Sequence, residues 1–134
     1  MKITADTNVL VRVITEDDPA QAKLAQQMLE GAELVAMPLL ALAEMCWVLE
    51  RVYGFSKRDV ARAVRSLTDA ANAAVDSLAV ETGLALLNAG GDFADGAIAH
   101  DGMWLGADTF VTFDRKAMQL IQAAGMSARA PEIL

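Results

Sequence analysis

The segment Ile3-Thr4-Ala5-Asp6-Thr7-Asn8 constrains the fold of this chain most, because small and apolar residues run directly into an acid. The first three residues predict a short buried strand that ends where Asp6 begins. In open α/β sheets, ligands bind just beyond the carboxyl ends of the strands. Asp6 is therefore either a site residue or a cap for the segment that follows.

A second segment of the same kind lies near the C-terminus. Residues 109–113 are all β-branched or aromatic and give the strongest strand signal in the chain, and Asp114 ends them. Further short strands are predicted at Leu34–Met37, around Val75 and at residues 126–129. Strands separated by helices indicate an α/β fold with a parallel sheet and helices on both faces. We expect Asp6 and Asp114 to lie on the same rim of that sheet.

Helices are predicted between the strands from apolar spacing and from capping residues such as Asp18 before Pro19 and Ser56 before Lys57. They cover residues 19–30, 38–53, 57–70, 78–88, 93–105 and 115–124. Val9–Thr15 fits either a strand by propensity or a short helix with a buried face. A chain of 134 residues is expected to form one domain, residues 1–134.

The composition limits which cellular compartment and which binding partners are expected. Apolar residues make up 54% of the chain, but the longest near-apolar run, Leu34–Ala43, contains Pro38 and is too short to span a bilayer. No signal peptide is evident. The single cysteine, Cys46, indicates a buried thiol and a reducing cytoplasm. The net charge of −7 argues against nucleic acid as a partner, unless several acids are gathered around a cation.

Glu44, Asp92 and Asp95 complete a set of unusual acids. Glu44 interrupts an apolar helix, with Leu40, Trp47 and Met37 at helical offsets, so we expect it near a buried face where a charge needs a partner or a metal. Asp92 and Asp95 are three residues apart and share one face at the start of a helix.

Each acid also has a purely structural interpretation. Asp6, Asp92 and Asp114 fit helix caps, Glu44 can pair with Arg51, and an acid such as Asp95 is favoured in a first helical turn. If the acids converge, two charges about 5 Å apart cost roughly 3 kcal/mol at an effective dielectric near 20, so a cluster needs a cation. All-oxygen ligands suit Mg²⁺ or Mn²⁺, the ions used in phosphodiester hydrolysis.

Taken together, the acidic segments resemble the PIN-domain ribonucleases, and more narrowly the VapC-type toxins of bacterial toxin–antitoxin pairs. The resemblance covers almost the whole chain and rests on the order of four segments. These are residues 3–8, Pro38 with Glu44–Leu49, Asp92–Ile98 and Val111–Arg115. The family implies a PIN-like α/β/α sandwich around a short, mostly parallel central sheet.

The resemblance also implies an activity and a set of site residues. The activity is an endoribonuclease that depends on Mg²⁺ or Mn²⁺ and hydrolyses RNA. The implied catalytic and metal-binding residues are Asp6, Glu44, Asp95 and Asp114. The implied accessory residues are Asp92, Thr112, which would hydrogen-bond a metal-bound carboxylate, and Asn8, which would orient Asp6. The implied partners are RNA, a small antitoxin protein and a second copy of the chain. Gly96 stands where alanine is more usual and is expected to loosen its helix.

RNA needs cationic contacts, and Arg115 and Lys116, directly after Asp114, are the best candidates. One face of a predicted helix carries three arginines, Arg58, Arg62 and Arg65. This stripe fits either phosphate contacts or a solvated helix face. We expect Trp47 and Trp104 to belong to the core and His100 to be structural or exposed.

Two other functions remain open from the residues alone. A haloacid-dehalogenase-like phosphatase also has an acid after a strand, but it needs a second Asp two residues on, where this chain has Asn8. A non-catalytic PIN-like interaction module is the other alternative. Degenerate modules usually lose acids, whereas this chain keeps all four.

Overall fold

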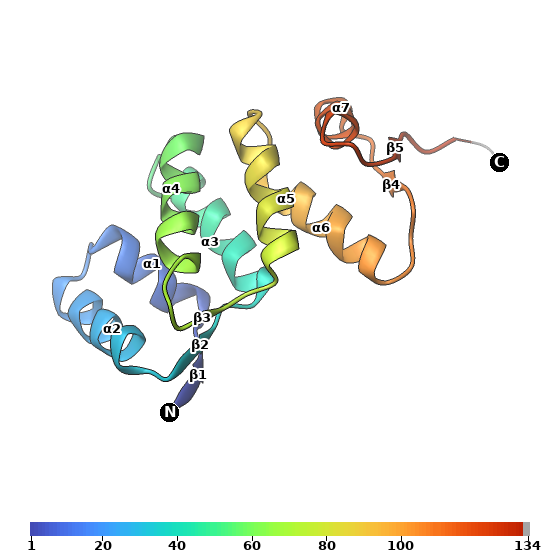
Figure 1. The fold of residues 1–134 in the computed structure, drawn as a ribbon. Coiled ribbons are helices and arrows are strands. Elements are labelled where there is room, and N and C mark those ends of the chain that lie inside the picture. Colours follow the sequence, from blue (N-terminus) through green and yellow to red (C-terminus); the bar gives the residue numbers. More distant parts are fainter. Residues whose placement is uncertain (133–134) are drawn as a thin grey trace. The chain divides into compact units, whose positions relative to one another are not determined.

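The computed structural model describes residues 1–132 and consists of two compact units, residues 1–76 and residues 77–134 (Figure 1). Each unit combines helices with short parallel strands. The two units are described separately below, because each has its own sheet and its own acidic residues.

The first unit contains three strands and four helices. In chain order they are β1 (Lys2–Thr4), α1 (Thr7–Thr15), α2 (Pro19–Gly31), β2 (Leu34–Ala36), α3 (Leu39–Arg51), α4 (Lys57–Thr68) and β3 (Ala73–Ala74). The strands form a parallel sheet in the order β1-β2-β3, with Ile3 opposite Val35 and Val35 opposite Ala73. The ladder continues beyond β1, because the Ala5 N–H donates to the Ala36 carbonyl at 2.9 Å. Asp6 therefore follows the last hydrogen-bonded residue of the strand.

The segment Val9–Thr15 is helical, which decides between the two alternatives that its sequence left open. Thr7, Leu10 and Val11 lie three and four residues apart and are the buried residues of α1, so the helix has one buried face. Burial of this face outweighs the preference of β-branched residues for strands.

The predicted starts of α2 and α4 are confirmed. The Asp18 carboxylate accepts a hydrogen bond from the Gln21 N–H at 3.1 Å, and the Ser56 hydroxyl accepts one from the Asp59 N–H at 3.1 Å. Both contacts satisfy a helix N–H that has no partner inside the helix. Cys46 is buried in α3, as expected, and burial raises the pKa of its thiol to about 12.

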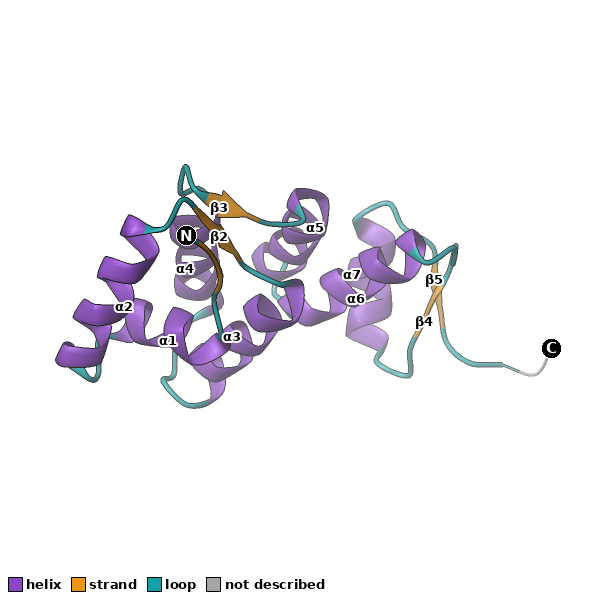
Figure 2. Ribbon diagram, turned by 90° about the horizontal axis from the view of Figure 1, so that it is seen from below, coloured by secondary structure: helices purple, strands orange, loops and turns teal. Residues whose placement is uncertain are grey.

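The second unit contains three helices and two short strands. They are α5 (Ser77–Asn88), α6 (Phe93–Trp104), β4 (Phe110–Val111), α7 (Arg115–Ala123) and β5 (Ala128–Arg129). β4 and β5 pair in parallel, with Phe110 opposite Ala128. Leu86, Ala99 and Ile121 form the buried core beneath them, one from each helix. Figure 2 shows how short these strands are beside the helices.

Helices α5 and α6 approach each other closely because glycines stand at their contact. A Cβ atom on Gly96 would lie 2.7 Å from the Thr82 carbonyl oxygen and 2.9 Å from the Gly83 Cα. A Cβ atom on Gly83 would in turn meet the Phe93 ring at 2.6 Å. Gly96 therefore has a packing role that the expectation of a loosened helix did not include. The missing side chain permits the tight packing that fixes the helix carrying Asp95.

The predicted α/β class with short parallel strands is confirmed. Two details differ. β4 has only two residues, where five were predicted, and β3 lies at residues 73–74, just before Val75. Among the described residues, hydrogen bonding places β1 and β4 in different sheets. The prediction that Asp6 and Asp114 lie on one rim of a single sheet is therefore wrong.

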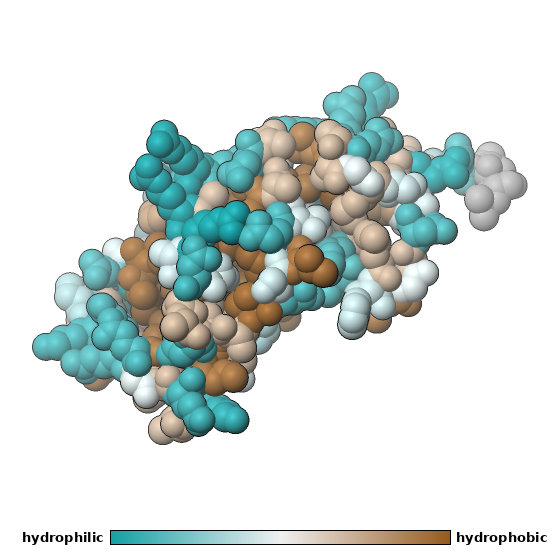
Figure 3. Space-filling model, viewed as in Figure 1, coloured by the Kyte–Doolittle hydropathy of each residue, from teal (hydrophilic) through white to brown (hydrophobic). Residues whose placement is uncertain are grey.

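Hydrophobic side chains reach the surface at several places on the face drawn in Figure 3. Over residues 1–132, none of the helices is both long enough and apolar enough to cross a membrane.

Candidate active site

Asp6 stands at the junction between β1 and α1, as its position in the sequence predicted. Its side chain is exposed, and its backbone is extended, with φ −73° and ψ 157°. One carboxylate oxygen, Oδ1, accepts a hydrogen bond from the Thr7 N–H at 2.9 Å. Asp6 thus begins the helix and also presents a carboxylate at the carboxyl end of a parallel strand. The two interpretations of this residue are compatible.

Thr7 links Asp6 to a second predicted site residue. The Thr7 hydroxyl donates to the Glu44 Oε2 atom at 2.9 Å, and Thr7 itself is only 9% exposed. This contact joins the start of α1 to the middle of α3, 37 residues further along the chain. Thr7 was not singled out from the sequence. The sequence feature that could have identified it is a hydroxyl residue directly after the acid that ends the strand.

Asn8 occupies a different position from the one that the family resemblance implied. Its side chain is exposed, and among residues 1–132 it makes no hydrogen bond to Asp6. The backbone N–H of Thr7 contacts the Asp6 carboxylate instead. Thr7, rather than Asn8, is therefore the residue that the structure connects to the acids of this unit.

Glu44 lies on an exposed face of α3, so the expectation of a buried face is wrong. Two of the three residues on which that expectation rested, Leu40 and Trp47, are 78% and 59% exposed. The third, Met37, is buried but lies before the start of α3. The buried face of α3 is formed instead by Leu42, Met45 and Leu49. Glu44 consequently pays little desolvation cost and is open to a ligand from solvent. Its hydrogen bond in the structure is with Thr7 and not with Arg51.

Two predicted acids stand at the start of α6, in the second unit. Asp92 occupies the N-cap position, but its side chain makes no capping hydrogen bond. Asp95 lies in the first turn and is half-buried. A carboxylate in the first turn of a helix interacts favourably with the helix dipole. The capping interpretation of Asp92 thus holds for its backbone position and not for its side chain.

Asp114 begins α7 and is held by two local hydrogen bonds. Its Oδ1 atom accepts from the Ala117 N–H at 3.0 Å, and its own N–H donates to the Thr112 hydroxyl at 3.0 Å. Thr112 therefore contacts Asp114 as the family resemblance implied, but through the backbone of Asp114 and not through its carboxylate. The capping contact uses only the Oδ1 atom of this carboxylate.

The turn Gly90-Gly91 brings the start of α7 against the segment that leads into α6. A Cβ atom on Gly91 would meet the Leu120 side chain at 2.5 Å, and a Cβ atom on Gly90 would lie 3.9 Å from the Lys116 Nζ atom. Gly90 also has φ +91°, a conformation that favours glycine. These glycines place an exposed lysine beside the turn that precedes Asp92.

Among the described residues, no group of three or more His, Cys, Asp or Glu side chains is gathered closely enough to hold a metal ion. Asp6 and Glu44 belong to the first unit, and Asp92, Asp95 and Asp114 belong to the second. All of these donors are carboxylate oxygens, and the exposed Asp6 and Glu44 are open to a ligand. Their chemistry fits Mg²⁺ or Mn²⁺ rather than Zn²⁺.

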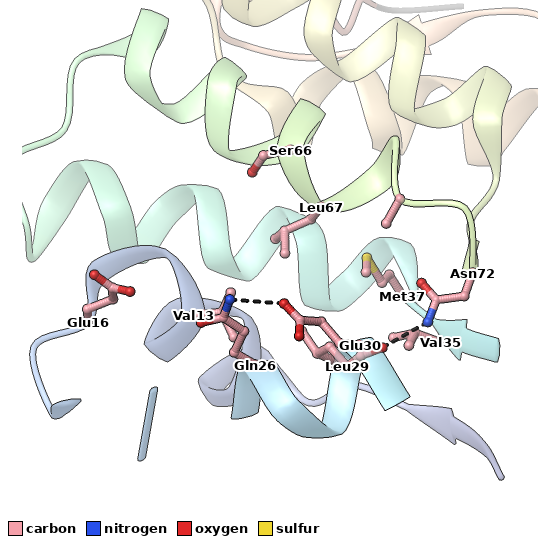
Figure 4. A pocket seen from close by; sticks show the side chains of 11 residues that line it. Val13, Glu16, Gln26, Leu29, Glu30, Val35, Met37, Ser66, Leu67 and Asn72 are labelled. Carbon is pink, nitrogen blue, oxygen red and sulfur yellow. Dashed lines mark hydrogen bonds between the residues drawn. The ribbon is translucent and has the colours of Figure 1, made fainter. Parts of the chain in front are cut away.

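A pocket of about 270 Å³ in the first unit lies apart from this set (Figure 4). Val35, Leu29 and Glu30 are among its lining residues. The Gln26 side chain donates to Glu30 Oε1 at 3.0 Å, and the Asn72 amide donates to the Leu29 carbonyl at 2.8 Å. None of the predicted acids lines this pocket.

The aromatic and histidine predictions have mixed outcomes. Trp47 and Trp104 are 59% and 84% exposed, so the expectation that they belong to the core is wrong. Each stands on the exposed side of its helix, whose buried side is filled by smaller residues. His100 is half-buried and lines a separate pocket with Glu81 and Met103.

Carboxylates at the carboxyl ends of parallel strands stand where ligands bind in α/β folds, and oxygen donors of this kind suit the divalent cations that phosphodiester hydrolysis uses. Comparison with protein families narrows the possible functions. The family model for the PIN domain matches residues 3–122, and the chain therefore belongs to the PIN-domain family. The matched range contains Asp6, Glu44, Asp95 and Asp114. PIN domains are generally nucleases that use divalent metals, so the function is of the nuclease type. Comparison with curated proteins finds no match.

Proposed function

We propose that this protein is an endoribonuclease dependent on Mg²⁺ or Mn²⁺ and the toxin of a type II toxin–antitoxin pair. The observation that carries the nuclease proposal is the family match over residues 3–122, which includes every acid in the predicted set. The exposed carboxylates at the ends of β1 and β4 support it, because they stand where ligands bind in α/β folds.

In this proposal the chain acts as a single PIN-like domain, residues 1–134, and four carboxylates serve one activity. Asp6, Glu44, Asp95 and Asp114 would hold the metal, with Asp92 as an accessory acid. When bound, Mg²⁺ or Mn²⁺ activates a water molecule and neutralises the charge that develops on the phosphate. Arg115 and Lys116 are exposed and would contact phosphates of the RNA.

Thr7 is a positioning residue in the same scheme. Its hydroxyl proton is directed at Glu44 Oε2, which leaves Oε1 of that carboxylate for a ligand. Its N–H is directed at Asp6 Oδ1, which leaves Oδ2 of Asp6 for a ligand in the same way. One residue thus orients two carboxylates and limits the rotation of each.

The test is cleavage of a mixed cellular RNA by the purified protein. We expect cleavage with Mg²⁺ or Mn²⁺, none after EDTA treatment, and recovery when the metal is restored. Asp6→Asn and Asp95→Asn should abolish cleavage while circular dichroism stays unchanged. Asp101→Asn, an exposed acid on the same helix as Asp95, is the matched control and should cleave normally. Normal activity in both site variants would refute the assignment.

The toxin proposal has a separate test in cells. Induced expression of the chain should arrest growth, Asp6→Asn should not, and co-expression of the small protein encoded beside it should restore growth. We propose that this antitoxin covers the exposed face of α3, where Leu40 and Trp47 flank Glu44, because exposed apolar side chains commonly mark protein interfaces. A homodimer in the reducing cytoplasm completes the proposal, and analytical ultracentrifugation tests its stoichiometry.

The alternatives predict different outcomes in the same assays. The haloacid-dehalogenase-like phosphatase is disfavoured by the family match and by Asn8, and it would hydrolyse a small phosphate ester while leaving RNA intact. A non-catalytic PIN-like module would bind a partner without cleaving RNA under any metal condition.

A further inference from the structure

Phe113 is an aromatic side chain that the fold leaves in water. It is 89% exposed, the highest value among the large hydrophobic side chains of the described residues. It stands between Thr112 and Asp114, directly before a proposed metal ligand. Because burial of an aromatic ring is normally favourable, a ring held outside the core is available for a partner.

The exposure of Phe113 does not come from a loose loop. The Thr112 N–H donates to the Arg129 carbonyl at 3.1 Å, which ties the residue before Phe113 to the β5 strand. The Asp114 N–H donates to the Thr112 hydroxyl at 3.0 Å, and Asp114 then caps α7. The backbone is therefore fixed on both sides of the ring, and little ordering entropy is lost when a ligand stacks on it.

The charges beside Phe113 indicate what kind of ligand it meets. Residues 77–134 contain only three basic residues, and two of them, Arg115 and Lys116, follow directly after Asp114. The third, Arg129, pairs with Glu132. Within residues 1–132, neither Arg115 nor Lys116 forms an ion pair. An exposed ring beside two unpaired cations matches a nucleotide, which offers a flat base and a phosphate.

We propose that Phe113 is a stacking platform for one unpaired base of the RNA substrate, next to the phosphate that Arg115 and Lys116 contact. This inference rests on the proposed ribonuclease function and adds a substrate requirement to it. A base inside a duplex already stacks on its neighbours and cannot lay its face on a protein ring. Phe113 therefore selects single-stranded or looped RNA over duplex RNA.

The test compares Phe113→Leu, which keeps an apolar side chain, with Phe113→Trp, which keeps a ring. Cleavage kinetics are measured on a fluorescent single-stranded RNA, on the same RNA in a duplex, and on a series in which one nucleotide at a time lacks its base. We expect Phe113→Leu to raise KM for the single strand about tenfold or more, with kcat nearly unchanged, because stacking on one base has this magnitude. Phe113→Trp should keep the wild-type KM.

The abasic series separates stacking from a structural role. For the wild type, removal of one particular base should raise KM as much as Phe113→Leu does, and the two changes together should have no additional effect. Wild-type KM for Phe113→Leu would overturn the stacking inference and leave the nuclease proposal intact. The same outcome with altered self-association in ultracentrifugation would assign Phe113 to a protein interface. A wild-type protein that cleaves no RNA would overturn both proposals.

Discussion

The two units fix their acids in different ways. In the first unit, Asp6 and Glu44 come from segments far apart in the chain and are joined by side chain and backbone contacts of Thr7. In the second unit, Asp114 is held by its own turn, through Thr112 and Ala117. The first arrangement is long-range and depends on a single residue, whereas the second is local and depends on helix capping. Mutations at equivalent positions should therefore have different consequences in the two units.

The second unit also depends on close backbone packing between α5 and α6. Disrupting this packing should change the free energy of unfolding more than the other stability changes considered below. A Cβ atom on Gly96 would meet backbone atoms of Thr82 and Gly83 at 2.7–2.9 Å, which a rotamer change cannot relieve. Gly96→Ala should therefore destabilise the protein by about 1–3 kcal/mol and displace the helix that carries Asp95. Chemical denaturation measures the free energy of unfolding.

Gly102→Ala is the matched control on the same helix. A Cβ atom on Gly102 would meet only the Ala107 side chain at 4.0 Å, an ordinary contact. Alanine is also the better helix former, so this change should be neutral or stabilise by up to about 1 kcal/mol. If Gly96→Ala and Gly102→Ala changed the free energy of unfolding equally, the close packing of α5 on α6 would not be what requires glycine at position 96.

The long-range arrangement of the first unit is tested by Thr7→Val, which keeps the shape of the buried side chain and removes its hydroxyl. Glu44 then loses its donor, while the Thr7 N–H contact to Asp6 remains. Loss of an orienting partner of a metal-bound carboxylate typically costs about 10–100-fold in activity or metal affinity. We expect a loss of cleavage near the lower end, because the backbone contact is retained.

Thr7→Ser keeps a hydroxyl at this position and should restore most of the cleavage rate that Thr7→Val loses. Metal affinity, measured by titration of Mn²⁺, should follow the same order. A Thr7→Val protein with normal cleavage and normal metal affinity would remove Thr7 from the site and leave Asp6 and Glu44 without the proposed connection.

Asp114 and Asp6 cap their helices differently, and this difference predicts a smaller effect on the stability of the protein. Asp114 accepts from the third residue of its helix, the usual capping contact, whereas Asp6 accepts from the first. Asp114→Ala should therefore destabilise the protein by about 0.5–2 kcal/mol. Asp6→Ala should cost less, and thermal denaturation of the two variants gives the comparison. If Asp6→Ala lost more stability than Asp114→Ala, Asp6 and not Asp114 would be the more important helix cap.

Much of this architecture was predictable from the sequence, because its signals are local. Capping residues such as Asp18 and Ser56 marked helix starts, and apolar runs ending in Asp6 and Asp114 marked strand ends. Such features depend on a few neighbouring residues, and the structure agrees with them to within a residue or two. The one local ambiguity, Val9–Thr15, was settled by burial of one helix face.

The errors concern tertiary packing, which no local pattern specifies. Trp47 and Trp104 were assigned to the core because they are large and apolar, yet smaller residues already fill the buried faces of their helices. Helix propensity alone predicts that Gly96 loosens its helix, because the contacts that require a glycine come from another helix. Thr7 was missed for the same reason, since its partner is 37 residues away. The sequence shows which residues are unusual, whereas the fold decides which of them meet.

In the first unit, Asp17, which follows α1, contacts Tyr53, which follows α3. The loss of this contact should have the smallest effect on stability, and that effect should depend on pH. The Tyr53 hydroxyl donates to Asp17 at 2.5 Å, and Arg12 forms an ion pair with the same carboxylate at 3.1 Å. The Tyr53 hydrogen bond is the largest cause that lowers the pKa of Asp17 below its ordinary value of 3.8. Burial opposes it, and the Thr15 hydroxyl and the Arg12 charge lower the pKa further.

A carboxylate whose pKa is lowered by folding stabilises the protein above its ordinary pKa, and this stabilisation is lost as the pH falls through the lowered value. Tyr53→Phe should therefore reduce the unfolding free energy slightly at pH 5–7, and the difference from wild type should shrink below about pH 4. Urea denaturation at several pH values measures it. A difference that stays constant down to pH 2 would mean that the Tyr53 hydroxyl stabilises the protein independently of the Asp17 charge, for example through the hydrogen bond that it accepts from Arg12 at 3.4 Å.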